Sequence, residues 1–327
     1  MNELNTLKLE KCPEEVEAEI ASELVTINDV VRYATSYLIE NEVFLGHGTD
    51  SYWDEAMYLV MCTINLDPPA DPDTLNARLT MREKKNIAKV LTKRVKERVP
   101  SAYLTNSAWF CDIEFYVDER VLIPRSPIGE MIKNKFQPFL TKQPTRILDL
   151  CTGCGCIALA CANAFRDCDD LMIDAVDISD DALDVCATNI YKYGVEDFVF
   201  PIKSDIFDGL PTDEKYDFIV CNPPYVDTAD LEDMPEEFCK EPKLALEAGE
   251  DGLDLVKVIL AEAKDHLTED GFIVIEVGNS QLALQMQFSE IPFHWVEFNN
   301  GGSGVFVLTY NELVEYSEYF DEFRRNK

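Results

Sequence analysis

The chain has 327 residues and a formal net charge of −33, with 62 acidic residues against 29 basic ones. This length allows one ordinary domain and a smaller one. Because so negative a field repels phosphate backbones, direct DNA binding is not expected. The same field favours encounter with a basic partner. A general solubility or salt adaptation would also produce this charge, and the two interpretations are compatible.

Eleven cysteines, several of them crowded into one short turn, predict reduced thiols in a cytosol rather than a disulfide framework. The opening segment, residues 1–11, lacks the apolar core of a secretory leader. No apolar run approaches the roughly 18 residues that a membrane span needs. The sequence therefore predicts a cytoplasmic protein with no membrane partner.

The first hundred residues are expected to be helical. Residues 25–43 and 53–66 carry apolar side chains at helical spacing, and the proline-rich break at 67–73 separates them from the next helix. Residues 108–124 then alternate apolar and polar side chains around a turn near Cys111–Glu114, which predicts a β-hairpin. A short helix around 127–140 is expected to follow.

From about residue 145 the pattern changes to short, strongly apolar, β-branched runs. These runs are RILDL at 146–150, MIDAV at 172–176, FVFPIKSD at 198–205, YDFIVCN at 216–222 and FIVIEVGN at 272–279. Helical stretches separate them at 156–165, 179–193 and 253–268. This alternation predicts an α/β fold with a Rossmann-like, mainly parallel sheet covered on both faces. Two later runs, near 293–299 and 304–310, predict an antiparallel hairpin at the sheet edge.

Three regions follow from these patterns. Residues 1–125 are expected to form a helical domain that ends in the β-hairpin. Residues 126–311 are expected to form the α/β domain. Residues 312–327 are polar and are expected to form a frayed tail.

The first apolar run of the α/β region leads into a tight turn that contains Gly153 and Gly155, and a helix follows. Glycine lets the backbone approach a ligand closely, and open α/β sheets bind ligands at the carboxyl ends of their strands. Taken alone, this turn could hold a dinucleotide, or it could serve only to pack the strand against the helix.

Acidic residues at the ends of the first three strands narrow these alternatives. Asp149 lies in the first strand, and Asp177 closes the second, where a carboxylate can accept from both hydroxyls of a ribose. Asp205 closes the third strand, placed to accept from the exocyclic amine of an adenine, with Ile206 or Phe207 beside the ring. Each aspartate alone could be a solvated loop residue, but three in register favour a nucleoside-type ligand.

Metal binding is a rival interpretation of the glycine turn, because Cys151, Cys154 and Cys156 form a C-x₂-C-x-C pattern. The spacing is cramped for a tetrahedral zinc site, and no matching pair of Cys or His follows. The pattern also differs from the C-x₃-C-x₂-C run that holds the cluster of radical AdoMet enzymes. We expect these thiols to be small apolar fillers and the chain to hold no metal.

The fourth strand ends in Asn222-Pro223-Pro224-Tyr225. Two prolines after a buried strand fix a rigid extended loop and leave carbonyls without intramolecular partners. A planar NH₂ group on an sp² carbon could donate to the Asn222 side-chain oxygen and the Pro223 carbonyl, with the Tyr225 ring on its flat face. The lone pair of the NH₂ nitrogen would then point at the methyl carbon of a sulfonium. No strong base is needed, because the sulfonium leaving group is excellent and the proton is lost after transfer. The motif predicts methyl transfer to an amide or aniline-like nitrogen.

With these residues in hand, the chain resembles the glutamine-specific protein methyltransferases related to the release-factor methyltransferase. The resemblance runs from about residue 25 to 310 and includes the glycine turn, PSAYL at 100–104, FYVDERVLIPR at 115–125, NPPYV at 222–226, EPKLALEAGEDGL at 241–253 and EVGNSQ at 276–281. It implies a class I methyltransferase that uses S-adenosyl-L-methionine (AdoMet) and releases S-adenosyl-L-homocysteine. The family's cofactor positions fall on Asp149, Cys151 to Gly155, Asp177, Ile206 and Asn222, and its amide-holding residues on Asn222, Pro223 and Tyr225.

The chain departs from the release-factor enzymes at two places. Cys151 replaces the first glycine of the usual G-x-G-x-G turn, and PRSPIGE at 124–130 stands where those enzymes usually read P-R-P-D-T-E. Both departures, with GHGTDSYWDEA at 46–56, are similar to the branch that methylates a glutamine of large-subunit ribosomal protein L-three. The resemblance implies that basic protein as partner, free or in an assembly intermediate.

In this interpretation the N-terminal helices and the hairpin recognise the substrate protein. Arg125 helps to frame the mouth of the active site. His47, Asp50 and Trp53 are candidates for substrate contact, and packing inside the small domain is the alternative for Trp53.

Three other functions share part of this pattern. Methylation of the adenine amine in DNA uses a similar N-P-P-Y loop on a flipped base, but it requires a basic cleft and a target-recognition segment that the sequence lacks. Methylation of the release factor uses the same chemistry on a different protein. A non-catalytic AdoMet-binding or ribosome-assembly protein would leave the N-P-P-Y loop without a purpose.

Overall fold

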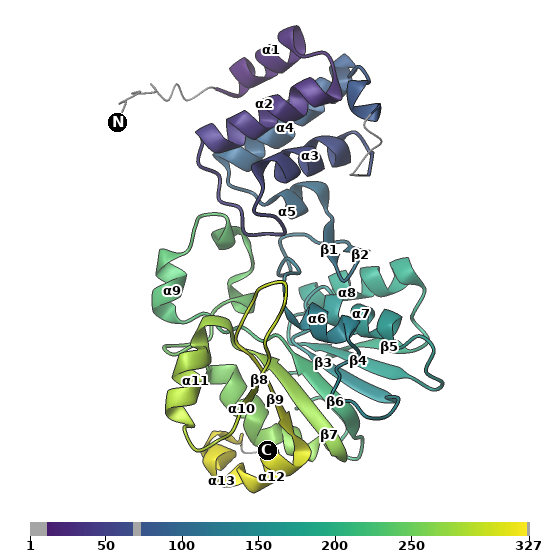
Figure 1. Cartoon of the computed structure of the whole chain (residues 1–327), viewed down its shortest axis with the longest axis vertical. Helices are drawn as coiled ribbons and strands as arrows, with labels where there is room; N and C mark the ends of the chain where they lie inside the picture. The colour runs from purple at the N-terminus through teal and green to yellow at the C-terminus, as the bar shows by residue number, and fades with distance from the viewer. Residues whose placement is uncertain (1–11, 68–72, 326–327) are drawn as a thin grey trace. The chain divides into compact units, whose positions relative to one another are not determined.

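The computed structural model describes residues 12–67 and 73–325 (Figure 1). The opening segment at 1–11 and most of the proline-rich break at 67–73 lie outside these residues. Within the described ranges, no helix is long and apolar enough to cross a membrane. The chain forms two compact units. The first comprises Met1–Asn106 with Pro235–Lys240, and the second comprises Ser107–Met234 with Glu241–Lys327.

The first unit is helical, as predicted. Its helices are α1 (Pro13–Glu23), α2 (Ile27–Glu40), α3 (Tyr52–Thr63), α4 (Met81–Lys96) and α5 (Ser101–Thr105). Helix α2 shows why they form: the Thr26 hydroxyl accepts from the Asp29 amide, and the Asp29 carboxylate accepts from the Thr26 amide in return. Apolar side chains at helical spacing, such as Val30 and Leu38, are fully buried between the helices.

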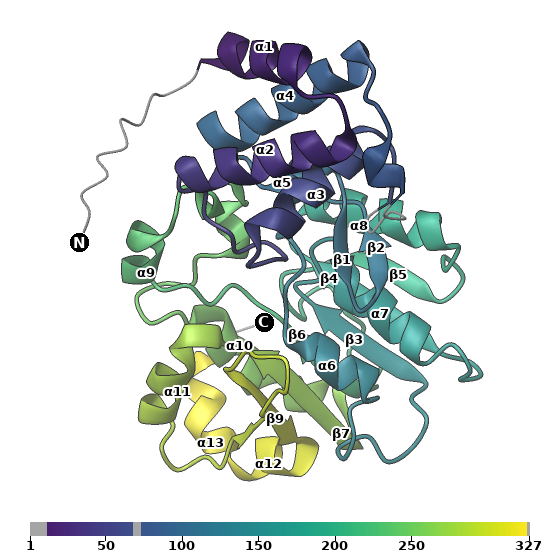
Figure 2. The same ribbon diagram turned by 45° about the horizontal axis from the view of Figure 1, so that its top comes forward.

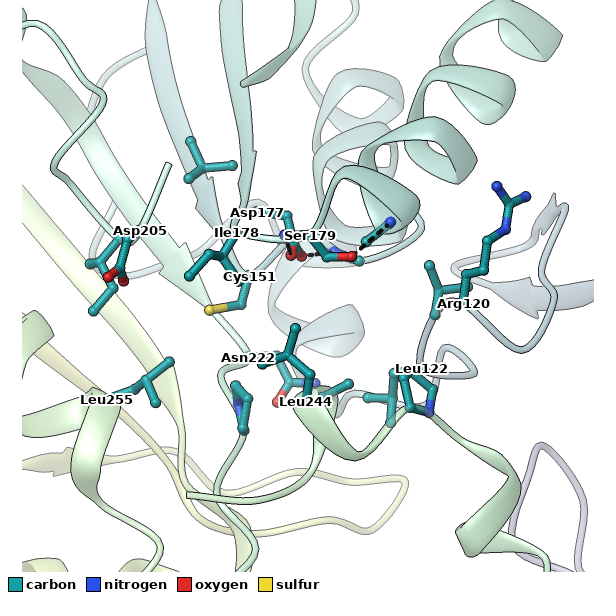
Figure 3. A pocket seen from close by; sticks show the side chains of 18 of the residues that line it. Arg120, Leu122, Cys151, Asp177, Ile178, Ser179, Asp205, Asn222, Leu244 and Leu255 are labelled. Carbon is teal, nitrogen blue, oxygen red and sulfur yellow. Dashed lines mark hydrogen bonds between the residues drawn. The ribbon is translucent and has the colours of Figure 1, made fainter. Parts of the chain in front are cut away.

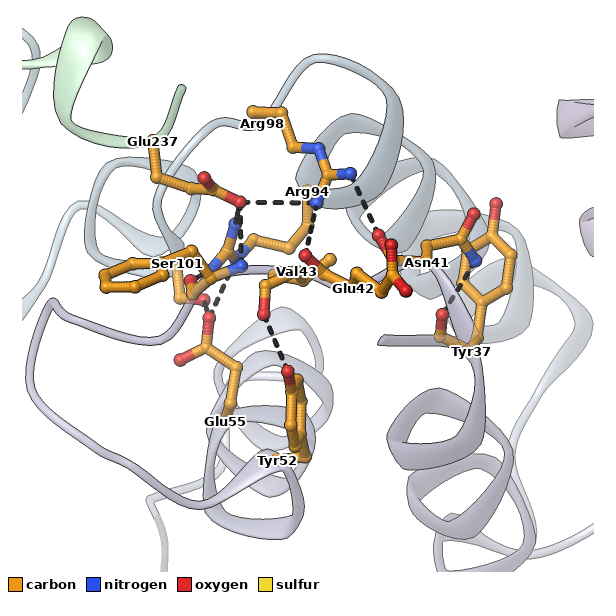
Figure 4. A network of polar contacts seen from close by, with 11 residues as sticks. Tyr37, Asn41, Glu42, Val43, Tyr52, Glu55, Arg94, Arg98, Ser101 and Glu237 are labelled. Atoms are coloured by element: carbon orange, nitrogen blue, oxygen red, sulfur yellow. Dashed lines mark hydrogen bonds and ion pairs between the residues drawn. The ribbon is translucent and has the colours of Figure 1, made fainter. Parts of the chain in front are cut away.

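The short segment Pro235–Lys240, which is distant in sequence, completes this first unit through Glu237 (Figure 4). The Glu237 carboxylate accepts from the Phe44 amide at 3.0 Å and pairs with Arg94 at 3.5 Å and Arg98 at 3.4 Å. Arg94 is 1% exposed and also donates to the Glu55 carboxylate at 2.8 Å. A buried guanidinium needs such partners, since an unpaired buried charge is strongly destabilising.

The second unit is built on a seven-stranded sheet with the order β5-β4-β3-β6-β7-β9-β8. The strands are β3 (Arg146–Leu150), β4 (Met172–Asp177), β5 (Val199–Lys203), β6 (Tyr216–Cys221), β7 (Leu267–Glu276), β8 (His294–Trp295) and β9 (Val305–Thr309). Strands β3 to β7 are parallel, while β9 pairs antiparallel with β7 and with β8. The predicted α/β class, mainly parallel sheet and antiparallel edge hairpin are confirmed.

Helices cover both faces of this sheet (Figures 1 and 2). One face carries α6 (Ile128–Lys133), α7 (Cys156–Ala164) and α8 (Asp180–Tyr193), and the other carries α10 (Asp254–Glu262), α12 (Tyr310–Glu315) and α13 (Ser317–Phe320). Two further short helices, α9 (Thr228–Asp233) and α11 (Gln281–Gln287), follow β6 and β7. Every residue of β6 is buried, which explains why the strand is apolar apart from Asp217, whose carboxylate accepts from the Thr145 and Arg146 amides.

Two predicted helices are shorter than expected. The helix expected at 127–140 ends at Lys133, because Lys135 and Phe136 adopt positive φ and Pro138 follows. The helix expected at 253–268 ends at Glu262, and a single turn of 3₁₀ helix leads to β7 at Leu267.

The predicted boundary at residue 125 is wrong, because the β-hairpin belongs to the second unit. Strands β1 (Ala108–Phe110) and β2 (Ile113–Phe115) pair antiparallel, as predicted. The hairpin is held by α8: Lys192 donates to Glu114 at 2.9 Å, and the Tyr116 amide donates to the Asn189 side chain at 2.8 Å. These contacts join the hairpin to the unit that contains the seven-stranded sheet, so the chain changes unit after Asn106.

The prediction of a frayed tail at 312–327 is wrong for the residues up to 325. Helix α12 begins with a capping box, in which the Thr309 hydroxyl accepts from the Glu312 amide. Leu313 and Phe320 are fully buried in the core beneath α10. Burial of these two apolar side chains is what anchors an otherwise polar segment.

Candidate active site

The glycine turn connects β3 to α7 and is held from below by Asp149. This carboxylate accepts from the Thr152 hydroxyl at 2.6 Å and from the Ala158 amide at 3.0 Å, and its other oxygen, Oδ1, has no partner among the described residues. Burial raises the pKa of Asp149 to about 7. Gly155 has a φ of +81°, and a Cβ there would lie 2.7 Å from the Cys186 sulfur, so this position requires glycine.

Cys151, which stands in place of the usual first glycine of the turn, adopts a left-handed φ of 59°. A side chain in this conformation is strained, and such strain is concentrated at functional sites. Its sulfur faces a cavity (Figure 3). Within the described residues, no group of three or more Cys, His, Asp or Glu side chains is arranged to hold a metal ion.

Asp177 ends β4 and turns both of its carboxylate oxygens toward backbone amides. Oδ2 accepts from Gly153 and Oδ1 accepts from Ser179, each at 2.9 Å. Burial raises the pKa of Asp177, and the two amides oppose that rise by stabilising the ionised form. The bonds fix the carboxylate between the glycine turn and the first turn of α8, at the carboxyl edge of the sheet.

A cavity of about 240 Å³ lies over this edge (Figure 3). Asp205 and Leu255 lie at one end and Arg120 and Leu122 at the other. Asp177, Cys151 and Asn222 lie between them. A carboxylate flanked by apolar walls suits a ligand with a sugar diol and a flat apolar ring, so the residues present fit an adenosine-type group.

Asn222 follows β6 and carries the orphaned polar atom of this cavity. Its side-chain oxygen is buried and has no hydrogen-bond partner among the described residues. A buried acceptor without a donor is costly, and functional sites are where such atoms persist. Pro224 also lines the cavity, and Pro223 is buried behind it. The Asn222 oxygen is therefore available to a ligand that donates an N–H.

Tyr225 is fixed just beyond the cavity wall. Its hydroxyl donates to the Glu276 carboxylate at 3.0 Å. Burial, followed by the nearby Glu276 charge, raises the pKa of Tyr225, so the phenol keeps its proton.

Asp205 lines the cavity, but its carboxylate is already engaged. Arg325, from the C-terminal segment, lies 2.9 Å from the Asp205 Oδ2 atom. The next residue, Ile206, has a φ of 51°, which is rare for a β-branched residue, and its side chain also lines the cavity. Sequence analysis missed Arg325, because a polar tail gives no signal for so distant a partner.

Arg125 is paired with the buried carboxylate of Glu241. Its two terminal nitrogens donate to the two Glu241 oxygens at 2.6 and 2.7 Å, and the Ile123 amide donates to the same carboxylate at 3.0 Å. This bidentate pair braces the segment 123–125 against the segment 241–253. The proposed role of Arg125 at the substrate entrance stays a prediction.

The cavity brings some predicted site residues together and not others. Its lining includes Cys151, Gly153, Asp177, Asp205, Ile206, Asn222 and Pro224. Among the described residues, those predicted for the site but outside this lining are Arg125, Asp149, Gly155, Pro223 and Tyr225. The lining also contains residues that sequence analysis did not single out, chiefly Arg120, Ser179, Pro242, Leu244, Glu247 and Leu255. Several of these fall in stretches that carried the family resemblance but no recognisable chemistry.

The three candidates in the first unit have different environments. The His47 ring packs against Phe238 with 4.5 Å between centroids. Trp53, in the first turn of α3, is 40% exposed, and Asp50 is exposed. Trp53 is therefore partly packed and partly open to solvent, and contact with substrate stays a prediction for all three.

Known proteins resemble the chain over most of its length. Residues 135–252 match the family described as "Methyltransferase small domain". The "Ribosomal protein uL3 glutamine methyltransferase" of Francisella tularensis subsp. tularensis is 49% identical over 93% of this chain and 96% of its own. The protein of the same name from Neisseria meningitidis serogroup A is 43% identical over 90% and 97%. The solved hMettl16 catalytic domain is 17% identical, with a TM-score of 0.47 over 69% of this chain and 80% of its own.

The two curated relatives match both the helical first unit and the sheet unit. Identity of 43–49% over so much of each chain extends far beyond the N-P-P-Y loop and the glycine turn. The chain therefore belongs to the ribosomal protein uL3 glutamine methyltransferase family.

Proposed function

We propose that this enzyme transfers a methyl group from AdoMet to the side-chain amide nitrogen of one glutamine in ribosomal protein uL3. The observation that carries the proposal is the buried, unpartnered Asn222 oxygen, which faces a cavity fit for an adenosine-type ligand. Membership of the uL3 glutamine methyltransferase family supports the choice of substrate.

The residues that would hold the donor line the cavity in order. Asp177 would accept from the ribose hydroxyls with the lone pairs that its two amide bonds leave. Asp205 and Ile206 would hold the adenine, and the Cys151–Gly155 turn would let the backbone approach the remainder. When bound, AdoMet would supply an electrophilic methyl group on a sulfonium: its thioether would be the leaving group, and the amide nitrogen would lose its proton after the transfer.

The residues of the N-P-P-Y loop would hold the acceptor. An amide nitrogen is a poor nucleophile, because its lone pair is delocalised into the carbonyl. Hydrogen bonds from its two N–H groups to the Asn222 oxygen and the Pro223 carbonyl would localise that lone pair. Tyr225 would restrain the amide plane. Positioning of this kind is worth up to about 7–11 kcal/mol in favourable cases, so the site needs no strong base.

The strongly acidic composition supports a basic protein partner. A net charge of −33 would attract a cationic ribosomal protein and speed its encounter by roughly 10–10³-fold at low salt. The same charge opposes binding to DNA or to naked RNA. Association should therefore weaken as ionic strength rises, since exposed charges are screened.

The proposal is tested by offering methyl-labelled AdoMet to three acceptors in parallel: uL3, a release factor and duplex DNA. Each acceptor has a control in which the candidate glutamines, or the adenines, are replaced. We expect label on uL3 alone, lost when one glutamine is replaced. Label on the release factor would keep the mechanism and overturn the substrate. Label only on DNA would overturn the acceptor class.

A further inference from the structure

A buried chain of hydrogen bonds runs behind the Tyr225 ring. The Tyr225 hydroxyl donates to one oxygen of Glu276 at 3.0 Å, and the Ser126 hydroxyl donates to the other. The Ser126 oxygen in turn accepts from the Ile128 amide at 3.1 Å. Glu276 is only 4% exposed, so its carboxylate is shielded from bulk water. Ionisable groups are rarely buried this deeply unless partners compensate them, and here both oxygens have one.

The backbone around Tyr225 is held as tightly as its hydroxyl. Ser280 donates to the Tyr225 carbonyl at 3.0 Å. A Cβ on Gly278, whose φ is +45°, would lie 2.5 Å from the Tyr225 ring. A Cβ on Gly252 would lie 2.3 Å from the Tyr225 carbonyl oxygen. Glycines at both positions therefore let the main chain close around the tyrosine, and little room is left for the ring to tilt.

Ser126, which lies in the PRSPIGE segment at 124–130, supplies the hydroxyl that satisfies the second oxygen of Glu276. Serine at this position orients the carboxylate, and the carboxylate orients the phenol.

We propose that Glu276, oriented by Ser126, is a positioning residue that fixes the Tyr225 ring against the acceptor amide. The inference rests on the proposed function, in which Tyr225 restrains the plane of the glutamine amide. A misplacement of about 1 Å can cost on the order of 10²-fold in rate, so a fixed ring matters to turnover more than to donor binding. Glu276 itself is not among the residues that line the donor cavity.

The test is a double-mutant cycle that joins Glu276→Ala to Tyr225→Phe, with kcat, KM for uL3 and the Kd of S-adenosyl-L-homocysteine measured for each variant. We expect Glu276→Ala to lower kcat by about 10–100-fold with little change in Kd. In the Tyr225→Phe background the same substitution should cost much less, because the hydroxyl through which it acts is already missing. Glu276→Gln, which keeps one acceptor, should recover part of the rate, and Ser126→Ala should lose a smaller part.

The matched control is a similar pair on the same sheet. Tyr216 donates to the buried Asp174 at 2.7 Å, and neither residue lines the cavity. Asp174→Asn should lower stability without this split between kcat and Kd. Equal losses of kcat from Glu276→Ala in the wild-type and Tyr225→Phe backgrounds would overturn the proposal that Glu276 acts through Tyr225.

A second readout does not depend on catalysis. With 3-fluorotyrosine at position 225, the ¹⁹F spectrum should show one ring orientation in the wild type and averaged or multiple signals in Glu276→Ala. Identical spectra for the wild type and Glu276→Ala would also overturn the proposal that Glu276 fixes the Tyr225 ring. Absence of methyl transfer to uL3 by the wild-type enzyme would instead overturn the proposed function, so the two failures are distinguishable.

Discussion

The Arg325 guanidinium contacts both the side chain and the backbone carbonyl of Asp205. One terminal nitrogen lies 2.9 Å from the Asp205 Oδ2 atom, and the other donates to the Asp205 carbonyl oxygen at 2.9 Å. The guanidinium also lies 3.3 Å from Asp208 and 3.5 Å from Glu262. A residue close to the C-terminus therefore orders the loop at one end of the cavity.

Replacing Arg325 with alanine should raise the KM for AdoMet by about 3–10-fold, because partly exposed ion pairs each contribute up to roughly 1 kcal/mol. The kcat for uL3 at saturating donor should change little. Arg324→Ala is the matched control, since its partner is Asp265, which is not part of the cavity lining among the described residues. Equal KM values for the two variants would mean that the contact between Arg325 and Asp205 has no part in donor binding.

Asp177→Asn should weaken the binding of S-adenosyl-L-homocysteine by about 10–100-fold, because hydrogen bonds to a charged group contribute about 1.5–3 kcal/mol. An amide keeps only one acceptor oxygen, so it cannot serve two backbone amides and a ribose. Calorimetric titration measures the change, with Asp174→Asn on the same strand as control. A loss of kcat at unchanged affinity would contradict this assignment.

Asn222→Ala should lower turnover by about 10²–10³-fold, the effect of removing one preorganised polar group from a reacting centre. The fold should survive, since the Asn222 side-chain oxygen bonds to no other described residue. Single-turnover transfer of labelled methyl to uL3 gives the rate, and circular dichroism checks the fold. Near-wild-type turnover by Asn222→Ala would contradict the proposed mechanism.

Cys151 should be protected from alkylation by the bound product. Its sulfur faces the cavity, so saturation with S-adenosyl-L-homocysteine at ten times Kd should slow its reaction with N-ethylmaleimide about 10-fold by mass action. Peptide mass spectrometry follows each cysteine separately. Cys239 is exposed, lies in the first unit, and should react at an unchanged rate. Equal protection of both thiols, or of neither, would place the product elsewhere.

Asp149 should make stability depend on pH. Burial raises its pKa from 3.8 to about 7, so the folded state holds a proton that the unfolded state has lost. This contribution to stability is fully present below pH 3.8 and is lost as the pH rises through about 7. Asp149→Asn lacks it, so urea unfolding should show the variant gaining stability relative to wild type between pH 5 and 8. A difference that does not vary with pH would refute this account.

The parallel core of the fold was predictable because local sequence carries its signal. RILDL at 146–150 became β3 with those bounds, since a strand buried on both faces is rich in apolar residues such as Ile147, Leu148 and Leu150. Asn222 and Asp177 were found for a related reason: the ends of parallel strands meet at one edge, so the sequence order of the strands locates the site.

The remaining features depend on contacts that local patterns do not encode. Glu276 lies in the EVGNSQ segment at 276–281, which is part of the family resemblance, but its hydrogen bonds to Tyr225 and Ser126 join residues 51 and 150 positions away. The hairpin was assigned to the wrong unit because its alternating apolar and polar residues predict strands but not the contact with Asn189 of α8. Burial of Phe320 was missed because isolated apolar residues in a polar tail show no period.

The first unit is assembled from two stretches of chain, and this limits how the enzyme can be dissected. A fragment that stops at Asn106 would keep Arg94 in its interior without the carboxylate of Glu237. A fragment that starts at Ser107 would carry residues 235–240 with no helices to receive them. Chimeras between relatives should therefore exchange both stretches together, because a first unit that is exchanged by a single crossover after Asn106 would lack its own residues 235–240.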